Sequence, residues 1–153
     1  MSKINWKDKC WVTTIFLVRK DEKVLLTWNK NLQTWIPVGG HIDEGETPEE
    51  AVAREVAEET GFSFEFLTPP EFENSHQIKI IHPYRVQIEN VPHHNKHINI
   101  VFFGKCISSD DAVTKTDEDE KLRWFSEKEL LAEPMLEGVK KSALAAIERY
   151  KKA

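Results

Sequence analysis

Cysteine is scarce in this chain. Cys10 and Cys106 are the only two cysteines among 153 residues, and neither belongs to a CxxC pair. This pattern argues against a disulfide framework, because small disulfide-stabilised domains carry several cysteines at short spacings. The expected state is two reduced, partly buried thiols, as is usual for a cytoplasmic protein.

Long hydrophobic runs are missing as well. The best apolar run extends from Trp11 to Val18 and includes two threonines, whereas a membrane-spanning helix needs about 20 apolar residues. The N-terminal stretch MSKINWKDKCWVTTIFLV is interrupted by polar residues and shows no small-residue cleavage site, so it does not match a signal peptide. We therefore expect a cytoplasmic protein without a membrane partner.

Positive charge is not in excess. The chain carries 21 Lys and Arg against 26 Asp and Glu, for a formal net charge of −5. Nothing in this balance predicts a nucleic-acid partner, and a cation is the expected partner of any acidic cluster. The rest of the composition is ordinary for a globular protein, with 40% hydrophobic residues. The length predicts one domain over residues 1–153.

The pattern of apolar residues predicts an α/β fold with a mixed sheet. β-Branched and aromatic residues predict a hairpin over residues 10–19 and 24–28. An amphipathic helix is expected at the C-terminus, within EGVKKSALAAIERYKK. Further strands are expected at 62–67, 76–91 (interrupted near Pro83), 97–107 and 122–126.

The clearest local signal is a helix from about residue 48 to residue 60. Thr47 is a suitable N-cap, Pro48 suits the first helical position, and Glu50 completes a T-x-x-E capping box. Gly61 follows the last helical residue, where a left-handed backbone favours glycine.

Three glutamates gather on one side of this helix. At about 100° per residue, Glu55, Glu58 and Glu59 fall within one sector, and Ala53 and Val56 are expected to form a neighbouring apolar face that packs on the sheet. Like charges at these spacings each cost about 0.2–0.5 kcal/mol, and carboxylates near the helix C-terminus oppose its dipole. A solvated acidic face is one interpretation. A site for a hard divalent cation is the other, since Mg²⁺ or Mn²⁺ prefers several oxygen ligands.

The surrounding residues favour the second interpretation, because they resemble the Nudix box, G-x5-E-x7-R-E-U-x-E-E-x-G-U. Two positions depart mildly from the usual pattern: Phe62 is aromatic where an aliphatic residue is common, and Val38 stands where many members have proline. A hairpin before the box and RWFSEKEL with a final helix after it extend the resemblance to the whole chain. The matching positions are Gly40, Glu46, Arg54, Glu55, Val56, Glu58, Glu59 and Gly61.

The resemblance implies a Nudix-type α/β/α sandwich and an enzyme. Members of the family use divalent metal ions to hydrolyse the diphosphate linkage of a nucleoside diphosphate joined to another group. The substrate would be a nucleotide such as an NTP or dNTP, ADP-ribose or a nucleotide sugar, and the cofactor Mg²⁺, or else Mn²⁺. The alternative is a Nudix-fold module that binds a nucleotide without cleaving it. A homodimer is suggested by analogy with relatives alone.

The resemblance also implies roles for individual residues. Glu55, Glu59 and then Glu58 are the expected metal ligands, together with the Gly40 carbonyl oxygen. Arg54 is expected to hold the catalytic carboxylates in place.

Other positions have weaker support. Glu46 is expected to pair with Arg54, and both Glu46 and Gly61 are structural parts of the box. The general base is either Glu55 itself or an acid from outside the box, for which Glu120 is the candidate because it shortly precedes the RWF stretch. The rest of that acidic loop fits a solvated charge run equally well.

Two residues outside the box are candidates for contacting the substrate. Trp28 offers a flat face on which a nucleobase can stack, although a place in the core suits tryptophan too. His97 ends the stretch HHNKH and starts a strand. It is a candidate for a position near the substrate phosphates, whereas a zinc site built on His93 and His97 is disfavoured because Pro92 makes helical spacing improbable there.

Overall fold

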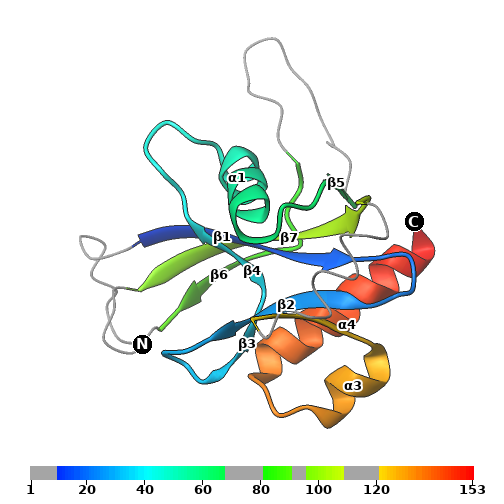
Figure 1. The fold of residues 1–153 in the computed structure, drawn as a ribbon. Helices are drawn as coiled ribbons and strands as arrows, with labels where there is room; N and C mark the ends of the chain where they lie inside the picture. Colours follow the sequence, from blue (N-terminus) through cyan, green and yellow to red (C-terminus); the bar gives the residue numbers. More distant parts are fainter. Residues whose placement is uncertain (1–9, 68–80, 91–95, 109–120) are drawn as a thin grey trace.

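The computed structural model describes residues 10–67, 81–90, 96–108 and 121–153. These residues form one sheet of eight strands with helices on both faces (Figure 1). The expected α/β fold with a mixed sheet is therefore confirmed. Among the described residues, no helix is both long enough and apolar enough to cross a membrane.

The sheet is mixed because its central pair is parallel while its other pairs are antiparallel. β1 and β7 run side by side in parallel, with Cys10 opposite His97 and Val18 opposite Lys105. β2, β3 and β8 extend the sheet on one side, and β5 and β6 both pair with β7 on the other. The strands are β1 (Cys10–Val18), β2 (Val24–Asn29), β3 (Thr34–Ile36), β4 (Val38–His41), β5 (Phe64–Phe66), β6 (Arg85–Glu89), β7 (His97–Cys106) and β8 (Leu122–Phe125).

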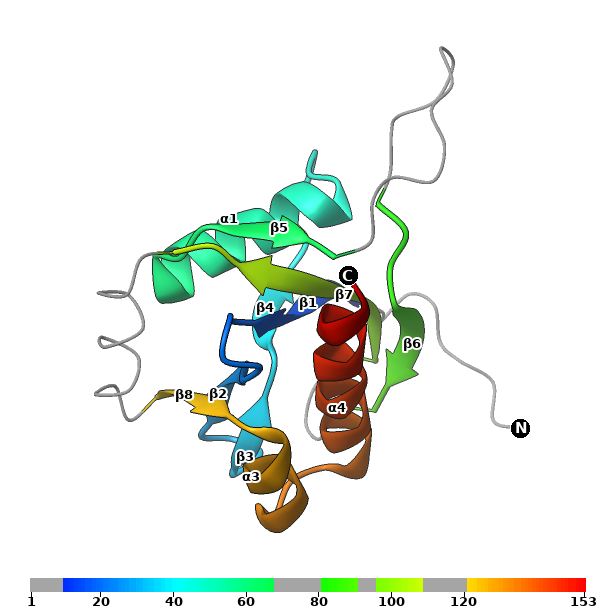
Figure 2. The same cartoon turned by 90° about the vertical axis from the view of Figure 1, so that its right-hand side faces the viewer.

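Two helices cover opposite faces of the sheet. α1 (Pro48–Thr60) lies on one face and α4 (Glu137–Lys152) on the other, with the short α3 (Glu127–Ala132) beside α4 (Figures 1 and 2). Strand side chains alternate between the two faces, so each face contributes to its own apolar cluster. This arrangement is the sandwich that the resemblance implied.

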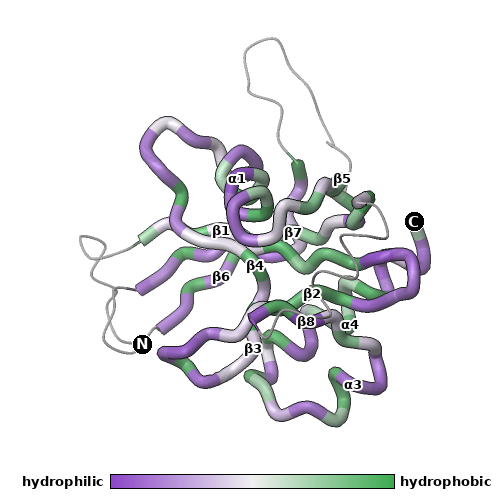
Figure 3. Tube along the Cα trace, viewed as in Figure 1, coloured by the Kyte–Doolittle hydropathy of each residue, from purple (hydrophilic) through white to green (hydrophobic). Residues whose placement is uncertain are grey.

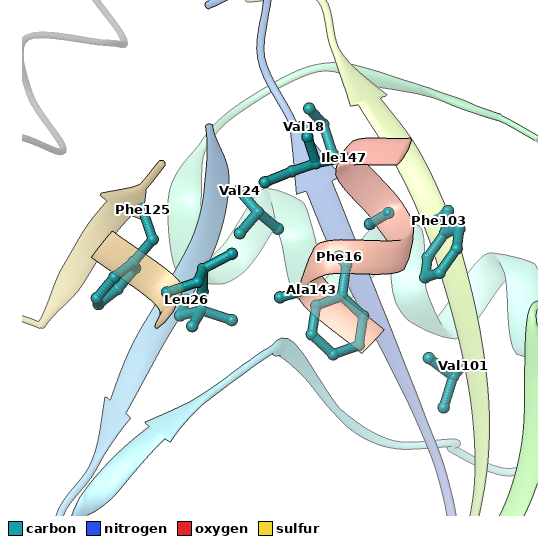
Figure 4. Close-up of a cluster of buried hydrophobic side chains, with 11 residues drawn as sticks. Phe16, Val18, Val24, Leu26, Val101, Phe103, Phe125, Ala143 and Ile147 are labelled. Atoms are coloured by element: carbon teal, nitrogen blue, oxygen red, sulfur yellow. The ribbon is translucent and has the colours of Figure 1, made fainter. Parts of the chain in front are cut away.

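The cluster under α4 is built from alternate residues of the strands. Phe16 and Val18 of β1 meet Val101 and Phe103 of β7, and Ala143 with other small residues of α4 closes the cluster from outside (Figure 4). The cluster under α1 lies on the opposite face of the sheet. It uses the intervening strand residues and the helix side chains Val52 and Val56.

Hydrophobic and hydrophilic segments are separated accordingly. The strands β1 and β2 are largely hydrophobic along the buried sheet, while the turn that leads into α1 is hydrophilic (Figure 3). The polar turn therefore remains at the surface, where it follows His41, the exposed end of β4. This position is where the box begins.

The helix predicted from residue 48 to residue 60 is confirmed at both ends. The Thr47 hydroxyl accepts a hydrogen bond from the Glu50 amide at 3.2 Å, and Pro48 occupies the first helical position. Gly61 has φ = 72°, and its amide donates to the carbonyl oxygens of Val56 and Ala57. Glycine adopts this left-handed backbone conformation at little cost in free energy, which explains why the helix ends here.

Other predictions need correction. α3 was missed, although Ser126 and Glu129 form a complete S-x-x-E capping box, the counterpart of the T-x-x-E pattern that identified α1. Of the strand expected over 76–91, the structure shows Arg85–Glu89; residues 81–84 are not strand, as the interruption expected near Pro83 predicts, and 76–80 lie outside the described residues. Two short strands were not predicted: within the stretch TWIPVGGH, β3 pairs with β2 and β4 pairs with β1.

Candidate active site

The box begins where β4 meets β1. Thr13 of β1 pairs with Gly40, and Thr14 pairs with Gly39. A Cβ atom at position 39 would collide with the Thr13 carbonyl oxygen, and one at position 40 would overlap the Glu55 carboxylate. Gly39 is therefore required by the close approach of backbone, whereas a side chain at position 40 would displace the Glu55 carboxylate, because Gly40 brings backbone directly against this acidic side chain of α1.

Arg54 connects most of the polar groups of the box. Its Nε and Nη2 donate to the two carboxylate oxygens of Glu46 at 2.8 and 3.0 Å, and Nη2 also donates to the His41 carbonyl oxygen at 3.0 Å. Its Nη1 donates to Glu55 at 3.0 Å. Such a bidentate pair is geometrically specific. The expected pairing of Glu46 with Arg54 is thus present, and it ties the end of β4 to α1.

The charges in this network stabilise each other. The hydrogen bonds from Arg54, followed by the one from the Asp43 amide, lower the pKa of Glu46 below its usual range. The hydrogen bond to Glu46 is the main cause of a raised pKa for Arg54. The guanidinium therefore remains charged, and the Glu46 carboxylate remains ionised, whatever happens at the neighbouring glutamates.

The three glutamates differ in their surroundings. The side chain of Glu55 is 14% exposed, whereas that of Glu58 is 60% exposed and lies 3.4 Å from Arg54. Burial, then a hydrogen bond with Glu55 and repulsion by its charge, raises the pKa of Glu59 to about 8, although a hydrogen bond from the Gly39 backbone opposes the shift. Glu55 and Glu59 thus form a close, hydrogen-bonded pair, in which the Glu59 carboxyl keeps its proton to a higher pH than an ordinary glutamate does.

This pair contacts β4, because Glu55 lies against Gly40 and Glu59 accepts a hydrogen bond from the Gly39 backbone. The buried residues of α1 are Ala51, Val52, Val56 and Thr60, and Ala53, which was expected to pack on the sheet, is exposed. The prediction for Ala53 was wrong because a wheel gives angles around a helix but not the direction from which the sheet approaches. Glu55 and Glu59 lie between buried positions and point to the end of β4.

A pocket of about 360 Å³ opens beside the pair. Glu59 and Gly39 form one side, and Trp28 at the end of β2 forms another. The indole of Trp28 also contacts Trp35 edge-to-face, with ring centroids 5.3 Å apart. The remaining lining residues are Thr27, Asn29, Ile36, Pro37, Lys121 and Leu122.

The structure brings most, but not all, of the predicted site residues together. The box residues meet at the end of β4, and Trp28 shares their pocket. His97 lies beside His41 instead, with ring centroids 5.7 Å apart. Glu120 lies outside the described residues, so its predicted role stays a prediction.

Sequence reasoning missed the polar residues of the pocket, Asn29 and Lys121. They reach it because β2 pairs with β8, with Thr27 opposite Leu122, and no local pattern encodes a pairing between strands so far apart in the chain.

The site has the properties that a divalent cation requires. Carboxylate and carbonyl oxygens are the ligands that Mg²⁺ and Mn²⁺ prefer. Glu55 approaches the Gly40 backbone so closely that a Cβ atom there would occupy the same space. The repulsion between Glu55 and Glu59, expressed in the raised pKa of Glu59, would be relieved by a cation held between them.

Comparison with protein families gives one clear match. The family model described as NUDIX domain matches residues 9–147. A protein of Bacillus subtilis (strain 168) named "Putative 8-oxo-dGTP diphosphatase" is 37% identical over 49 residues. That match spans 32% of this chain and 33% of the length of the relative.

Solved structures are similar over nearly the whole chain. A NUDIX-family hydrolase from Clostridium perfringens is 28% identical, with a TM-score of 0.77 over 90% of this chain and 95% of that one. An Ap4A hydrolase of C. elegans has a TM-score of 0.63 at 13% identity over 94% of this chain and 96% of that one. The second likeness concerns the fold alone.

Proposed function

Because this chain belongs to the NUDIX domain family, we propose that it is a divalent-metal-dependent hydrolase that cleaves a diphosphate linkage in a nucleotide. The observation that carries the proposal is the Glu55–Glu59 pair beside the Gly40 backbone. Such a pair costs folding free energy in the absence of a ligand. A metal ion explains why the chain keeps it.

The ion would be held by the carboxylates of Glu55 and Glu59, by the Gly40 carbonyl oxygen from β4, and by Glu58, which is more exposed than Glu55. When bound, Mg²⁺ supplies charge neutralisation for the substrate phosphates and lowers the pKa of a bound water toward that of hydroxide. Mn²⁺ suits the same oxygen ligands.

The residues of the chain position the reacting groups. Arg54 holds one oxygen of Glu55 at 3.0 Å while its other nitrogens are fixed by Glu46, so Glu55 cannot rotate freely. The proton that Glu59 keeps near neutral pH has to leave when a cation binds, so that binding releases a proton. Either Glu55 or Glu120 then serves as the general base.

The pocket next to Glu59 supports a nucleotide as the substrate. Trp28, Ile36, Pro37 and Leu122 provide apolar surface for a flat base, and Asn29 provides an amide for hydrogen bonding. The name of the Bacillus subtilis relative makes a purine nucleoside triphosphate, including the oxidised 8-oxo-dGTP, the first class to test.

The test is release of phosphate-containing product from a panel of substrates, with Mg²⁺ and with chelator. The panel holds (d)NTPs, 8-oxo-dGTP, ADP-ribose, nucleotide sugars, dinucleoside polyphosphates and coenzyme A. We expect metal-dependent turnover that is lost in Glu59→Gln and kept in Glu148→Gln, a matched change of an exposed glutamate on α4. Nucleotide binding without turnover of any substrate would contradict the hydrolase proposal and favour a nucleotide-binding module.

A further inference from the structure

A second group of metal-ligating side chains lies apart from the glutamates. The sulfur of Cys10 and one ring nitrogen each of His41 and His97 all lie within 4.8 Å of one another. We propose that these three residues bind a zinc ion, separate from the divalent ion of the carboxylate site. The family match does not imply such a site, because the box supplies oxygen ligands only.

Strand pairing explains why residues so distant in the sequence meet. Cys10 begins β1 and pairs directly with His97, which begins the parallel strand β7. His41 ends β4, and its partner on β1 is Val12, the next residue of β1 on the same face as Cys10. The ends of the three strands therefore converge at one edge of the sheet (Figure 1).

The cluster and the carboxylates lie on opposite faces of the sheet. Position 40 faces α1, since a Cβ atom there would overlap Glu55. The side chain of the next residue, His41, points to the other face because strand residues alternate. Cys10 and His97 share that face, in phase with Phe16 and Phe103 of the cluster under α4.

The ligand set selects a transition metal instead of Mg²⁺. A thiolate and two imidazoles are the ligands that Zn²⁺ prefers, at about 2.3 Å for sulfur and about 2.0–2.1 Å for nitrogen. A tetrahedral ion with these bond lengths requires ligand atoms about 3.3–3.6 Å apart. A shift of about 1 Å from the observed arrangement reaches this spacing, and rotation of the exposed His41 side chain allows it.

Acidic surroundings add to the attraction for a cation. Glu89 of β6 lies directly opposite His97 in the sheet. Its carboxylate is oriented by Asn99, whose amide donates to it at 3.0 Å. A carboxylate next to a histidine ligand commonly orients the ring and increases its basicity. Three protein ligands leave a fourth position for water, which the partial exposure of the cluster permits.

Zinc at this position would join β1, β4 and β7 where β4 enters the box. The His41 carbonyl oxygen accepts a hydrogen bond from Arg54 on the opposite face. One residue would thus take part in both sites, through its backbone on one side and its side chain on the other. We therefore expect zinc to stabilise the fold and to keep the turn after β4 in place.

Cobalt titration of the metal-free protein tests the proposal, because Co²⁺ replaces Zn²⁺ and a cysteine ligand adds a thiolate-to-cobalt absorption band. The titration is done in wild type and in Glu59→Gln, which impairs the carboxylate site. We expect one Co²⁺ bound with this band in both proteins, and its displacement by Zn²⁺. Circular dichroism checks that each variant is folded.

Variants and matched controls decide which residues bind. Cys10→Ala should abolish the band. His41→Gln or His97→Gln should weaken Co²⁺ binding by more than about 100-fold, because loss of a ligand costs more than loss of a residue that only supports a ligand. Cys106→Ala and His82→Gln should behave as wild type. A wild-type protein without the band, or a band that survives in Cys10→Ala, would overturn the proposal. These outcomes do not depend on whether the protein hydrolyses nucleotides, because they are read from cobalt binding and not from turnover.

Discussion

Glu59 carries the largest electrostatic cost of the site, since its carboxylate meets Glu55 beside the Gly39 backbone. We predict that Glu59→Gln lowers turnover at least about 100-fold, because a metal ligand is lost. The same variant should unfold in chelator at an equal or higher temperature, because a repulsion is removed. Initial rates and thermal melts measure both effects. Wild-type turnover in both Glu59→Gln and Glu58→Gln would contradict the assignment.

The raised pKa of Glu59 also predicts how the stability of the metal-free protein depends on pH. Its pKa rises from 4.5 to about 8 in the folded protein, so the native state binds more protons than the unfolded state between these values. The free energy of unfolding should therefore fall as pH rises from about 5 to about 8. Glu59 is only partly buried and water screens its charge, so we expect a loss on the order of 1 kcal/mol.

Urea unfolding of chelator-treated protein at several pH values measures this effect. The slope should disappear in Glu59→Gln, which cannot titrate. A slope of opposite sign in the wild type, or an unchanged slope in the variant, would show that another group dominates.

A substitution at Gly40 tests the close approach of the β4 backbone to the Glu55 carboxylate. In Gly40→Ala the new methyl group would overlap the Glu55 carboxylate, so we predict displaced ligands and at least about 10-fold weaker metal dependence of the rate. Gly138→Ala is the control, since a Cβ atom there meets nothing within 4 Å and alanine favours helix. A Mg²⁺ titration of the rate compares the two. Equal apparent Mg²⁺ affinities in both variants would argue against Gly40 as part of the site.

At the scale of elements, the turn between β4 and α1 depends on Arg54. The Asp43 amide donates to Glu46 at 2.8 Å, and Glu46 is held in turn by two nitrogens of Arg54. Arg54→Lys keeps the charge but removes the bidentate geometry. We predict faster hydrogen exchange at the Asp43 amide and a turnover roughly 10–100-fold lower.

Arg123→Lys provides the control for this prediction. Arg123 of β8 also pairs with a glutamate, Glu129 of α3, at 3.0 Å, and this pair lies outside the box. Exchange at Asp43 should remain unchanged in this variant. If Arg54→Lys leaves exchange and turnover intact, charge alone holds the turn.

Elements were predictable from the sequence wherever local chemistry specifies them. Thr47, Pro48 and Gly61 fix α1 through contacts within a few residues, so its bounds were predicted correctly. The capping box of Ser126 carried the same information for α3 and was overlooked. Among the described residues, the strand expected over 76–91 begins only at Arg85, after Pro83, because proline has no amide hydrogen to donate to a strand ladder.

At the scale of the molecule, the sequence could predict which residues form the box but not what lies around it. Trp28 and Lys121 line one pocket only because β2 pairs with β8. Cys10 was expected to be an ordinary thiol, and His97 was considered in relation to His93, because the β1–β7 register that unites Cys10 with His97 is a long-range property. Such contacts depend on the packing of the whole sheet.

In the whole molecule, the pairing of β4 with β1 fixes β4 in the sheet, so that α1 packs against it. The central claim is that this arrangement makes a metal-dependent hydrolase from the glutamates of α1. The most direct measurement is the initial rate of hydrolysis of the best substrate, with and without Mg²⁺, in wild type, Glu59→Gln and Glu148→Gln. We predict Mg²⁺-dependent hydrolysis in wild type and Glu148→Gln and a rate at least about 100-fold lower in Glu59→Gln. Hydrolysis that persists in chelator, or equally fast in Glu59→Gln, would contradict the account.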